Sequence, residues 1–374
     1  MKIAQVVTFV SADGSFGGPV SVAVAQAIEL AAQGHEVHLL AGWDGKADVL
    51  APGVTVKLFR TRRLVPAGFS GLIAPGMLAF LLRSFHEFDV VHIHQARDMI
   101  TLPVALLLSW KHANYVVQPH GMIRLDARFR ARFFDRVAVS RVLRTASSVI
   151  AYPGVDGDDL FQISHRKATV EQMVNGISID GILNSHQKQA EPANPPEVMF
   201  MARLHPRKRV LAFADMAKIL VQNGIDARFT VIGPDEGDLP ALTSFIAVNA
   251  LEGVLNYEGA IAYNLVRPRL SRAWVYVLPS VNEPFPITVL EAMAVGTPVV
   301  ITDSSGIAPF LSRAQAGSVT DGSPQSMAAA VGMLVSSPNA RTLMVSKAKQ
   351  LLEDKFSIKA VAWELETLYT RHER

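Results

Sequence analysis

Short apolar, β-rich runs alternate with helical segments along this chain of 374 residues. "MKIAQVVTFVS" at the amino terminus is followed by a loop with Gly14, Gly17, Gly18 and Pro19, by the helical segment "VSVAVAQAIELAAQG" and by "HEVHLLAG". A strand, a glycine-rich turn, a helix and a second strand form the unit of a parallel sheet with helices on its faces. This order predicts a Rossmann-like α/β domain, with Gly34 at the carboxyl cap of its first helix.

The alternation is interrupted once, by the polar, proline-rich segment "NSHQKQAEPANPP". A single hydrophobic core seldom serves more than about 250 to 300 residues, so we expect a domain boundary at this interruption. The expected parts are α/β domains at 1–183 and 197–355, a linker at 184–196 and an amphipathic helix at 356–374. Two facing Rossmann-like domains with a cleft between them are the predicted fold. Further strands are expected at Asp89–His94, Tyr115–Gly121 and Ser147–Pro153, and after the linker at Glu197–Arg203, Ala227–Gly233, Val254–Gly259, Trp274–Ser280 and Pro298–Asp303.

The composition excludes several classes of protein. The absence of cysteine rules out disulfide scaffolds, thiolate metal sites and cysteine nucleophiles, and it fits a reducing cytoplasm. The first apolar run ends near Ser11 without a signal-peptide cleavage pattern. Hydrophobic residues make up 49% of the chain and charged residues 18%, which indicates an ordered globular protein. We therefore expect a cytoplasmic protein.

The basic residues are clustered, although the net charge is only +3. One cluster is Arg60–Arg63, and a second is Arg124–Arg144, where arginines alternate with phenylalanines. The second segment is either a solvated helix face or a contact with an anionic membrane, which would place the protein peripherally at the inner membrane face. No nucleic-acid-binding motif accompanies the charge, so no nucleic acid partner is expected. The uncharged stretch Val65–Leu82 contains prolines and glycines that oppose a spanning helix, which favours a peripheral docking segment or a buried hairpin.

Two glutamates eight positions apart mark a candidate ligand site in "SVNEPFPITVLEAMAVGTPVV". Pro284 and Pro286 exclude a continuous helix across them, so Glu283 lies in a loop, while a helix can begin near Pro286, contain Glu291 and end at Gly296. In parallel sheets, ligands bind beyond the carboxyl ends of the strands, where this loop is expected. The amino end of the helix favours an anion, so the pattern predicts a phosphorylated ligand.

The two carboxylates allow two interpretations. Glu283 can accept hydrogen bonds from sugar hydroxyls while Glu291 holds a ribose diol. Alternatively, Glu291 only complements the helix dipole and Glu283 is a solvated loop residue. The pairing alone leaves both interpretations open.

The glutamate pair followed by "AMAVGTPVV" resembles the signature of retaining glycosyltransferases with the GT-B fold, family 4, whose second domain is known as glycosyl transferases group 1. The resemblance covers nearly the whole chain, because other motifs of that family occur in the same order. They are the glycines Gly17 and Gly18, "DVVHIH", "PHG" with His120, "VNGI", "ARLHPRK" with Arg203 and Lys208, and "VIGP" with Gly233.

The resemblance implies that the second domain binds a nucleotide diphosphate sugar and that the first presents the acceptor. Arg203 and Lys208 correspond to cations that stabilise the leaving diphosphate in place of a metal ion. His120 corresponds to an active-site histidine near the donor sugar, and Glu283 to the glutamate beside the transferred sugar. The substrate-binding residues implied by the resemblance are Gly17, Gly18, Gly233, Phe285, Pro286, Ile287 and Glu291, with Glu291 on the ribose.

Family members transfer the sugar with retention, by front-face attack in which the leaving phosphate accepts the proton of the acceptor. A covalent intermediate on Glu283 is the alternative mechanism. The resemblance thus implies a metal-independent retaining hexosyltransferase, without a cofactor, that acts on a lipid-linked or polysaccharide acceptor. A nucleotide-sugar epimerase of the same fold and a non-catalytic nucleotide-sugar-binding protein are the alternative functions. The family also implies that the helix at 356–374 crosses back to the first domain.

The sequence departs from the family at three positions and contains two patterns that resemble metal sites. Many members have glycine at the position of Pro286, and the common form of the family also has glycine at the positions of Ala202 and Arg209. "DGDD" at Asp156–Asp159 contains a D-x-D pattern, but it follows a strand in a turn-rich stretch and is expected to be a helix cap or turn. His92 and His94 share one face of a strand without a recognisable third ligand, so a structural or acceptor-site role is expected instead of a metal site.

Overall fold

The structure is a computed structural model, and it describes residues 1–10, 17–46, 49, 51–65, 68–125, 135–179 and 195–371. The chain forms two compact units. The first contains Met1–Ser178 together with Ile358–Arg374, and the second contains Ile179–Ser357. The expected linker at 184–196 lies almost entirely outside the described residues.

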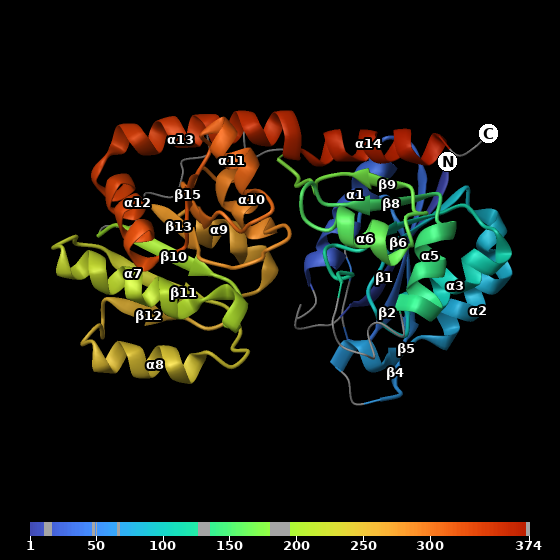
Figure 1. The fold of residues 1–374 in the computed structure, drawn as a ribbon, viewed down its shortest axis with the longest axis horizontal. Helices are drawn as coiled ribbons and strands as arrows, with labels where there is room; N and C mark the ends of the chain where they lie inside the picture. The colour runs from blue at the N-terminus through green and yellow to red at the C-terminus, as the bar shows by residue number, and fades with distance from the viewer. Residues whose placement is uncertain are drawn as a thin grey trace. The chain divides into compact units, whose positions relative to one another are not determined.

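The first unit is built on a parallel sheet of seven strands in the order β3-β2-β1-β6-β7-β8-β9 (Figure 1). β1 is central and pairs with both β2 and β6, so the chain runs outward from the middle of the sheet in both directions. The strands are β1 (Lys2–Val10), β2 (Glu36–Trp43), β3 (Thr55–Arg60), β6 (Val90–His94), β7 (Tyr115–Gln118), β8 (Ser148–Ala151) and β9 (Val170–Gln172).

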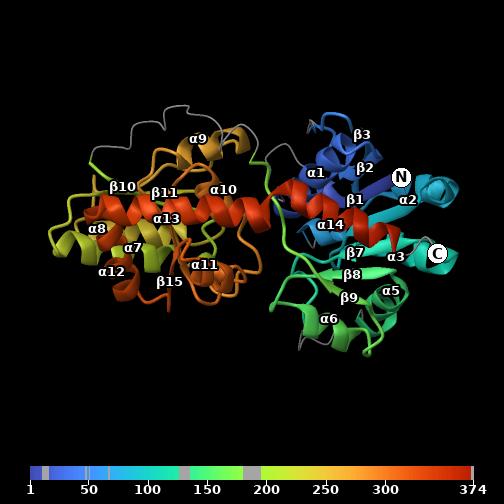
Figure 2. The same cartoon turned by 90° about the horizontal axis from the view of Figure 1, so that it is seen from above.

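Helices cover both faces of this sheet. One face, which carries Ala4, Val6 and Val91, forms a large apolar core with α2, α3 and α5. On the other face lies α1, and α14 lies beside α1 in both views (Figures 1 and 2). The helices are α1 (Gly17–Ala32), α2 (Pro75–Ser84), α3 (Thr101–Lys111), α5 (Ser140–Thr145), α6 (Gly157–Ile163) and α14 (Ile358–Thr370), and short helical turns occur at Gly68–Gly71, Phe85–Glu87 and Asp135–Val139.

The second unit has a six-stranded parallel sheet in the order β12-β11-β10-β13-β14-β15. Val198, Phe200 and Val277 face a core shared with α7 and α12, while α10 packs on the opposite face of β13 and β14. The strands are β10 (Glu197–Met201), β11 (Arg228–Ile232), β12 (Leu255–Tyr257), β13 (Val275–Leu278), β14 (Val299–Thr302) and β15 (Ser318–Thr320). The helices are α7 (Val210–Gln222), α8 (Leu239–Val248), α9 (Val266–Leu270), α10 (Ile287–Ala294), α11 (Ala308–Ala314), α12 (Pro324–Ser336) and α13 (Pro338–Leu351), with turns at Pro206–Lys208, Tyr263–Leu265 and Leu352–Phe356.

The prediction of two Rossmann-like α/β halves is confirmed, and the differences are local. α1 begins at Gly17, so Gly17, Gly18 and Pro19 belong to its first turn and not to the preceding loop. Proline is tolerated there because the first N–H groups of a helix have no intrahelical acceptor. The sheet-edge strands β3, β9 and β15 were not expected, because short half-exposed strands lack the continuous apolar run of central ones.

The uncharged stretch Val65–Leu82 does not form a single element. β4 (Arg62–Arg63) and β5 (Leu72–Ile73) pair antiparallel, and α2 follows with Met77 and Leu81 buried. Part of the stretch is therefore a hairpin and part is a core helix. Among the described residues, every helix is too short or too polar to cross a lipid bilayer.

We predict that Gly233→Ala destabilises the second unit by about 2 kcal/mol or more. Gly233 follows β11 with a φ of +144°, and an added Cβ would lie 1.9 Å from the carbonyl oxygen of Ala202. Gly332→Ala is the matched control, since its Cβ would meet Leu220 Cδ2 at an ordinary 3.5 Å within α12. This control should stabilise by about 0.5–1 kcal/mol. Urea unfolding of both variants measures the difference, and equal stability would contradict the prediction.

Candidate active site

A buried ion pair joins two neighbouring strands at the carboxyl edge of the second sheet. Lys208 ends the helical turn after β10, and Glu283 lies in the loop after β13, the strand next to β10. Lys208 Nζ donates to Glu283 Oε2 at 2.5 Å. The Lys208 side chain is 13% exposed and that of Glu283 is 9% exposed. The fold therefore brings together two of the predicted catalytic residues at the edge where such sheets bind ligands.

Further cations surround this pair. Arg207 Nη2 lies 3.9 Å from Glu283 Oε2. Burial lowers the pKa of Lys208, Glu283 opposes that shift, and the positive charges of Arg207 and Arg203 lower this pKa further. Arg207 was not among the predicted site residues, although its position next to Lys208 was the available signal. One carboxylate thus faces several cations, which leaves positive charge to bind an anion.

Arg203 is held differently from the prediction of a clamp with Lys208. Its Nη1 donates to both carboxylate oxygens of Glu236, at 2.7 and 2.8 Å. The Arg203 side chain is 45% exposed, so this pair is solvated and exchanges easily for another anion. Glu236 carries no motif signal in the sequence. The role of Arg203 on a diphosphate stays a prediction.

The loop that carries Glu283 is fixed through its backbone. Val281 N donates to the carbonyl oxygen of Arg207 at 2.9 Å, and Gly306 N donates to that of Glu283 at 2.9 Å. Asn282 adopts a φ of +50°, a left-handed conformation that asparagine tolerates better than most residues. The carboxylate of Glu283 is therefore held against Lys208 by a preformed turn.

The helix expected after the prolines is confirmed. α10 (Ile287–Ala294) has Pro286 at its N-cap, and Gly296 follows its end with a φ of +82°. Glu291 is 2% exposed within this helix, and its role stays a prediction. Glu283 is 7% exposed, so the interpretation of Glu283 as a solvated loop residue is wrong. Phe285 packs edge-on against Phe356 at a ring distance of 5.9 Å, so its side chain belongs to the core.

Two backbone conformations bear on the other predicted positions of the second unit. Gly233 follows β11, the neighbour of β10, and its crowded backbone explains why glycine is required there. Arg209 retains a left-handed φ of +56°, the conformation that glycine adopts without strain. The backbone at Arg209 is therefore one that a glycine could adopt without strain.

His120 belongs to the first unit and follows β7. It has a φ of +54°, and Gly121 has a φ of +71°. Asp156 holds this turn, because its Oδ2 accepts from Gly121 N at 3.1 Å and its Oδ1 accepts from Tyr152 N at 2.8 Å. Asp156 is also the N-cap residue of α6, so the expectation of a cap or turn for "DGDD" is confirmed.

His92 and His94 are both engaged by protein groups. His92 Nδ1 lies 2.6 Å from the Tyr369 hydroxyl, and His94 Nε2 lies 2.5 Å from Gln5 Oε1. Within the described ranges no three histidine or acidic side chains gather in a way that could hold a metal ion. The structural interpretation of these histidines agrees with their contacts. Gly18 lies in the first turn of α1, where an added Cβ would meet open space.

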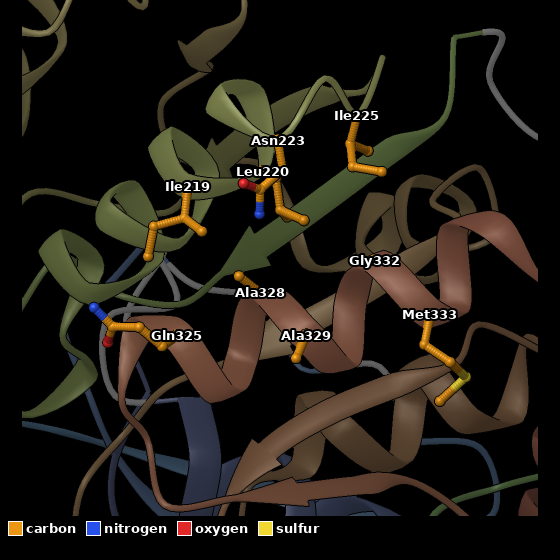
Figure 3. A pocket seen from close by; sticks show the side chains of 9 residues that line it. All are labelled: Ile219, Leu220, Asn223, Ile225, Gln325, Ala328, Ala329, Gly332 and Met333. Carbon is orange, nitrogen blue, oxygen red and sulfur yellow. The ribbon is translucent and has the colours of Figure 1, made fainter.

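A shallow pocket of about 420 Å³ lies between α7 and α12 of the second unit (Figure 3). Its lining is mostly aliphatic and includes Ile219, Leu220 and Met333. None of the predicted site residues lines it.

We predict that acid destabilises the first unit. Burial lowers the pKa of His92 and of His120 to about 3, and that of His94 well below its usual range. The unfolded chain therefore binds more protons than the folded chain as the pH falls below about 6.5. Each histidine then costs up to about 2 kcal/mol of unfolding free energy at pH 5. Urea unfolding at pH 7 and pH 5 measures this loss, which His92→Gln should reduce; equal stability at both pH values would contradict it.

Two family models match the chain. The model for Glycosyltransferase Family 4 matches residues 16–180, and the model for Glycosyl transferases group 1 matches residues 182–351. The alpha-D-kanosaminyltransferase of Streptomyces kanamyceticus is 28% identical over 291 residues, which cover 75% of this chain and 69% of that protein. The GDP-mannose-dependent alpha-(1-6)-phosphatidylinositol dimannoside mannosyltransferase of Mycobacterium tuberculosis is 25% identical over 350 residues, with 90% of this chain and 88% of that protein covered. Two colanic acid biosynthesis glycosyltransferases match over only 50% and 37% of their own lengths.

Solved structures agree on the fold. The crystal structure of Anabaena Alr3699/HepE in complex with UDP and glucose superimposes with a TM-score of 0.74 at 19% identity, covering 99% of each chain. The two family models, taken together, extend over nearly the whole chain and account for both Rossmann-like units. The chain therefore belongs to the GT-B glycosyltransferases of family 4.

Proposed function

We propose that this glycosyltransferase moves a hexose from a nucleotide diphosphate sugar to a glycan or lipid-linked acceptor, with retention of configuration and without a metal ion. The observation that carries the proposal is the cluster of Lys208, Arg207 and Glu283 at the carboxyl edge of the second sheet. The cluster lies in the two loops that precede α7 and α10, at the edge where parallel sheets bind nucleotides. The UDP and glucose named for the HepE complex support a donor of this class.

The cations would act on the leaving group. Negative charge builds up on the diphosphate as the glycosidic bond breaks, and fixed positive groups lower the energy of that transition state. Lys208 is already held in place by Glu283, and Arg203 is solvated enough to exchange Glu236 for a phosphate. This arrangement supplies the positive charge that a metal ion would otherwise provide. Glu291, buried in α10, is proposed to accept from the ribose hydroxyls.

Glu283 is proposed to orient the transferred sugar and not to form a covalent bond with it. Its Oε2 already accepts a hydrogen bond from Lys208, which occupies this oxygen and reduces its tendency to attack carbon. In the proposed reaction the acceptor oxygen bonds to the anomeric carbon, the bond to the phosphate oxygen breaks, and that phosphate oxygen takes the acceptor proton. Both events occur on one face of the sugar, which retains the configuration.

We predict that Lys208→Ala lowers kcat/KM by about 10²- to 10³-fold, because a fixed cation is lost from the leaving group. It should also destabilise the second unit by about 3 kcal/mol, because the buried Glu283 carboxylate loses its partner. Lys218→Ala on α7 is the matched control. It also removes a lysine, but the lysine that pairs with Glu283 is Lys208. Product formation from UDP-, GDP- and ADP-sugars, after a thermal-shift screen for the donor, measures the loss.

The same assay separates the alternative functions. An epimerase would convert the donor without an acceptor, and a binding protein would be stabilised by donor without any turnover. A protein stabilised by none of these donors would contradict the proposal. Equal activity of Lys208→Ala and Lys218→Ala would reject the role of the cation.

We also propose that the acceptor is met at an anionic membrane. Trp110 and Val137 are 64% and 60% exposed, and the exposed Arg136 and Arg144 lie in the segment around Val137. Arg141 Nε donates to Ser109 Oγ at 3.1 Å, which places this arginine next to the end of α3 that carries Trp110. Exposed apolar side chains beside arginines are typical of a surface that inserts shallowly into a charged bilayer. Residues 126–134 of the predicted basic segment lie outside the described residues.

We predict that Trp110→Ala weakens binding to vesicles containing anionic lipid about tenfold, because one large apolar contact is lost. Trp363→Ala is the control, since Trp363 is 65% exposed on α14, a helix without this arginine cluster. Co-sedimentation with the vesicles measures the difference, and binding should weaken as salt is added. Equal binding to neutral vesicles would reject the electrostatic part, and equal effects of both substitutions would reject the surface.

A further inference from the structure

We propose that Tyr152 and Tyr369 are positioning residues that select the tautomer of His120 through a buried chain of hydrogen bonds. The inference rests on the proposed function, because it assumes that His120 serves the transfer reaction. It goes further by assigning a purpose to polar residues of the first unit that no motif identifies.

The side chains that form this series of hydrogen bonds lie on one face of the first sheet. β1 and β6 place Gln5 opposite His92, and β6 and β7 place His94 opposite Gln118. These four side chains are at most 1% exposed. The opposite face of the same strands is apolar throughout the core with α2, α3 and α5. Several neighbouring polar side chains are seldom buried together, because each must form a hydrogen bond or lose its hydration without compensation.

The hydrogen bonds run continuously from α14 to His120. The Tyr369 hydroxyl on α14 lies 3.5 Å from Gln5 Nε2, and Gln5 Oε1 lies 2.5 Å from His94 Nε2. His94 Nδ1 lies 2.7 Å from His120 Nε2. The rings of His94 and His120 stack with their planes 9° apart. The first stretch of the chain thus ends at Nε2 of the candidate active-site histidine.

A second stretch reaches the other nitrogen of His120. Tyr152 Oη lies 2.9 Å from His120 Nδ1 and accepts from Asn175 Nδ2 at 2.6 Å. Asn175 Oδ1 in turn accepts from Gln118 Nε2 at 3.1 Å, and Gln118 Oε1 accepts from Gln26 Nε2 at 3.3 Å. Asn175 belongs to the "VNGI" motif, for which the sequence indicated no chemical role.

In this series, the donor and acceptor of one hydrogen bond determine the donor and acceptor of the next. A neutral histidine has one donor and one acceptor nitrogen, and an amide has separate donor and acceptor ends. Gln5 donates to Tyr369 through Nε2, so its Oε1 must accept from His94 Nε2–H. His94 Nδ1 is then an acceptor and receives the hydrogen of His120 Nε2–H. His120 Nδ1 is left as an acceptor, which Tyr152 satisfies by donating its hydroxyl hydrogen.

His120 is largely buried but retains some exposure, and it is the point where this hydrogen-bonded series reaches the surface of the first unit, at the carboxyl end of β7. A ring with its hydrogen on Nε2 presents Nδ1 as an acceptor for a hydroxyl group, here that of Tyr152. Removing either tyrosine hydroxyl takes away the group that enforces this direction. The result would be a mixture of tautomers, in which the imidazole ring of His120 is no longer held in a single orientation.

The test compares three tyrosine-to-phenylalanine variants. Tyr152→Phe removes the hydrogen bond to His120 Nδ1, and Tyr369→Phe removes the distant end of the chain. Tyr115→Phe is the matched control: Tyr115 is 1% exposed in the same sheet, but its hydroxyl bonds Val142 O and Thr145 Oγ1 and not a histidine. All three lose a buried hydroxyl contact, so stability alone cannot distinguish them.

The first readout is the tautomer of His120, followed by nitrogen NMR of histidine-labelled protein and assigned with His120→Gln. We expect a single Nε2–H form in the unsubstituted protein and in Tyr115→Phe, and a mixture in Tyr152→Phe and Tyr369→Phe. The second readout is steady-state kinetics, in which Tyr152→Phe should lower kcat about tenfold with KM within about twofold. Tyr369→Phe should change kcat in the same direction.

The outcomes separate this inference from the proposed function. An unchanged His120 tautomer in both Tyr152→Phe and Tyr369→Phe, or an equal fall in kcat for Tyr115→Phe, would overturn the inference. If the tautomers shift as expected but the unsubstituted protein transfers no sugar with any donor and acceptor, the hydrogen-bond chain stands and the proposed function fails.

Discussion

The ion pair between Lys208 and Glu283 is the interaction on which the second unit's site depends. Two charges are placed where water is largely excluded, and such a pair is stable only when its geometry is good and neighbouring groups satisfy it. The surrounding turn meets that condition, since Val281 N and Gly306 N anchor the loop by backbone hydrogen bonds. The consequence is a cation held in one place before any ligand arrives, which is the form in which electrostatic catalysis is most effective.

The first unit has the same kind of parallel sheet, but one face of its central strands buries polar side chains. One face of its central strands packs against apolar helices, as the alternating pattern requires. The other face carries glutamine and histidine side chains that hydrogen-bond with one another and with the tyrosine of α14. This helix belongs to the first unit although it comes last in sequence, and Ile358 N donates to Ile177 O where the chain returns. A series of hydrogen bonds through Gln5 and His94 therefore connects α14 to His120.

Much of the architecture could be predicted because it is local. Buried parallel strands appear as continuous apolar runs, and the prolines before Ile287 define where α10 can begin. The short edge strands β3, β9 and β15 were missed, because half-exposed strands lack that pattern. The motifs predicted Glu283, Lys208 and Glu291 as site residues. They did not predict the ion-pair partners Arg207 and Glu236, since an ion pair across separate loops leaves no periodic trace.

The amino-acid order alone determined the fold class and family, because strand and helix periodicity and motif spacing are properties of neighbouring residues. Only the tertiary structure decided which partner each charged or polar group would meet. It paired Arg203 with Glu236 and Lys208 with Glu283, and it joined His94, His120 and Tyr152 into one hydrogen-bonded chain. The physical reason is that a hydrogen bond or ion pair acts over about 3 to 4 Å, and distances of that kind between remote residues are created by packing.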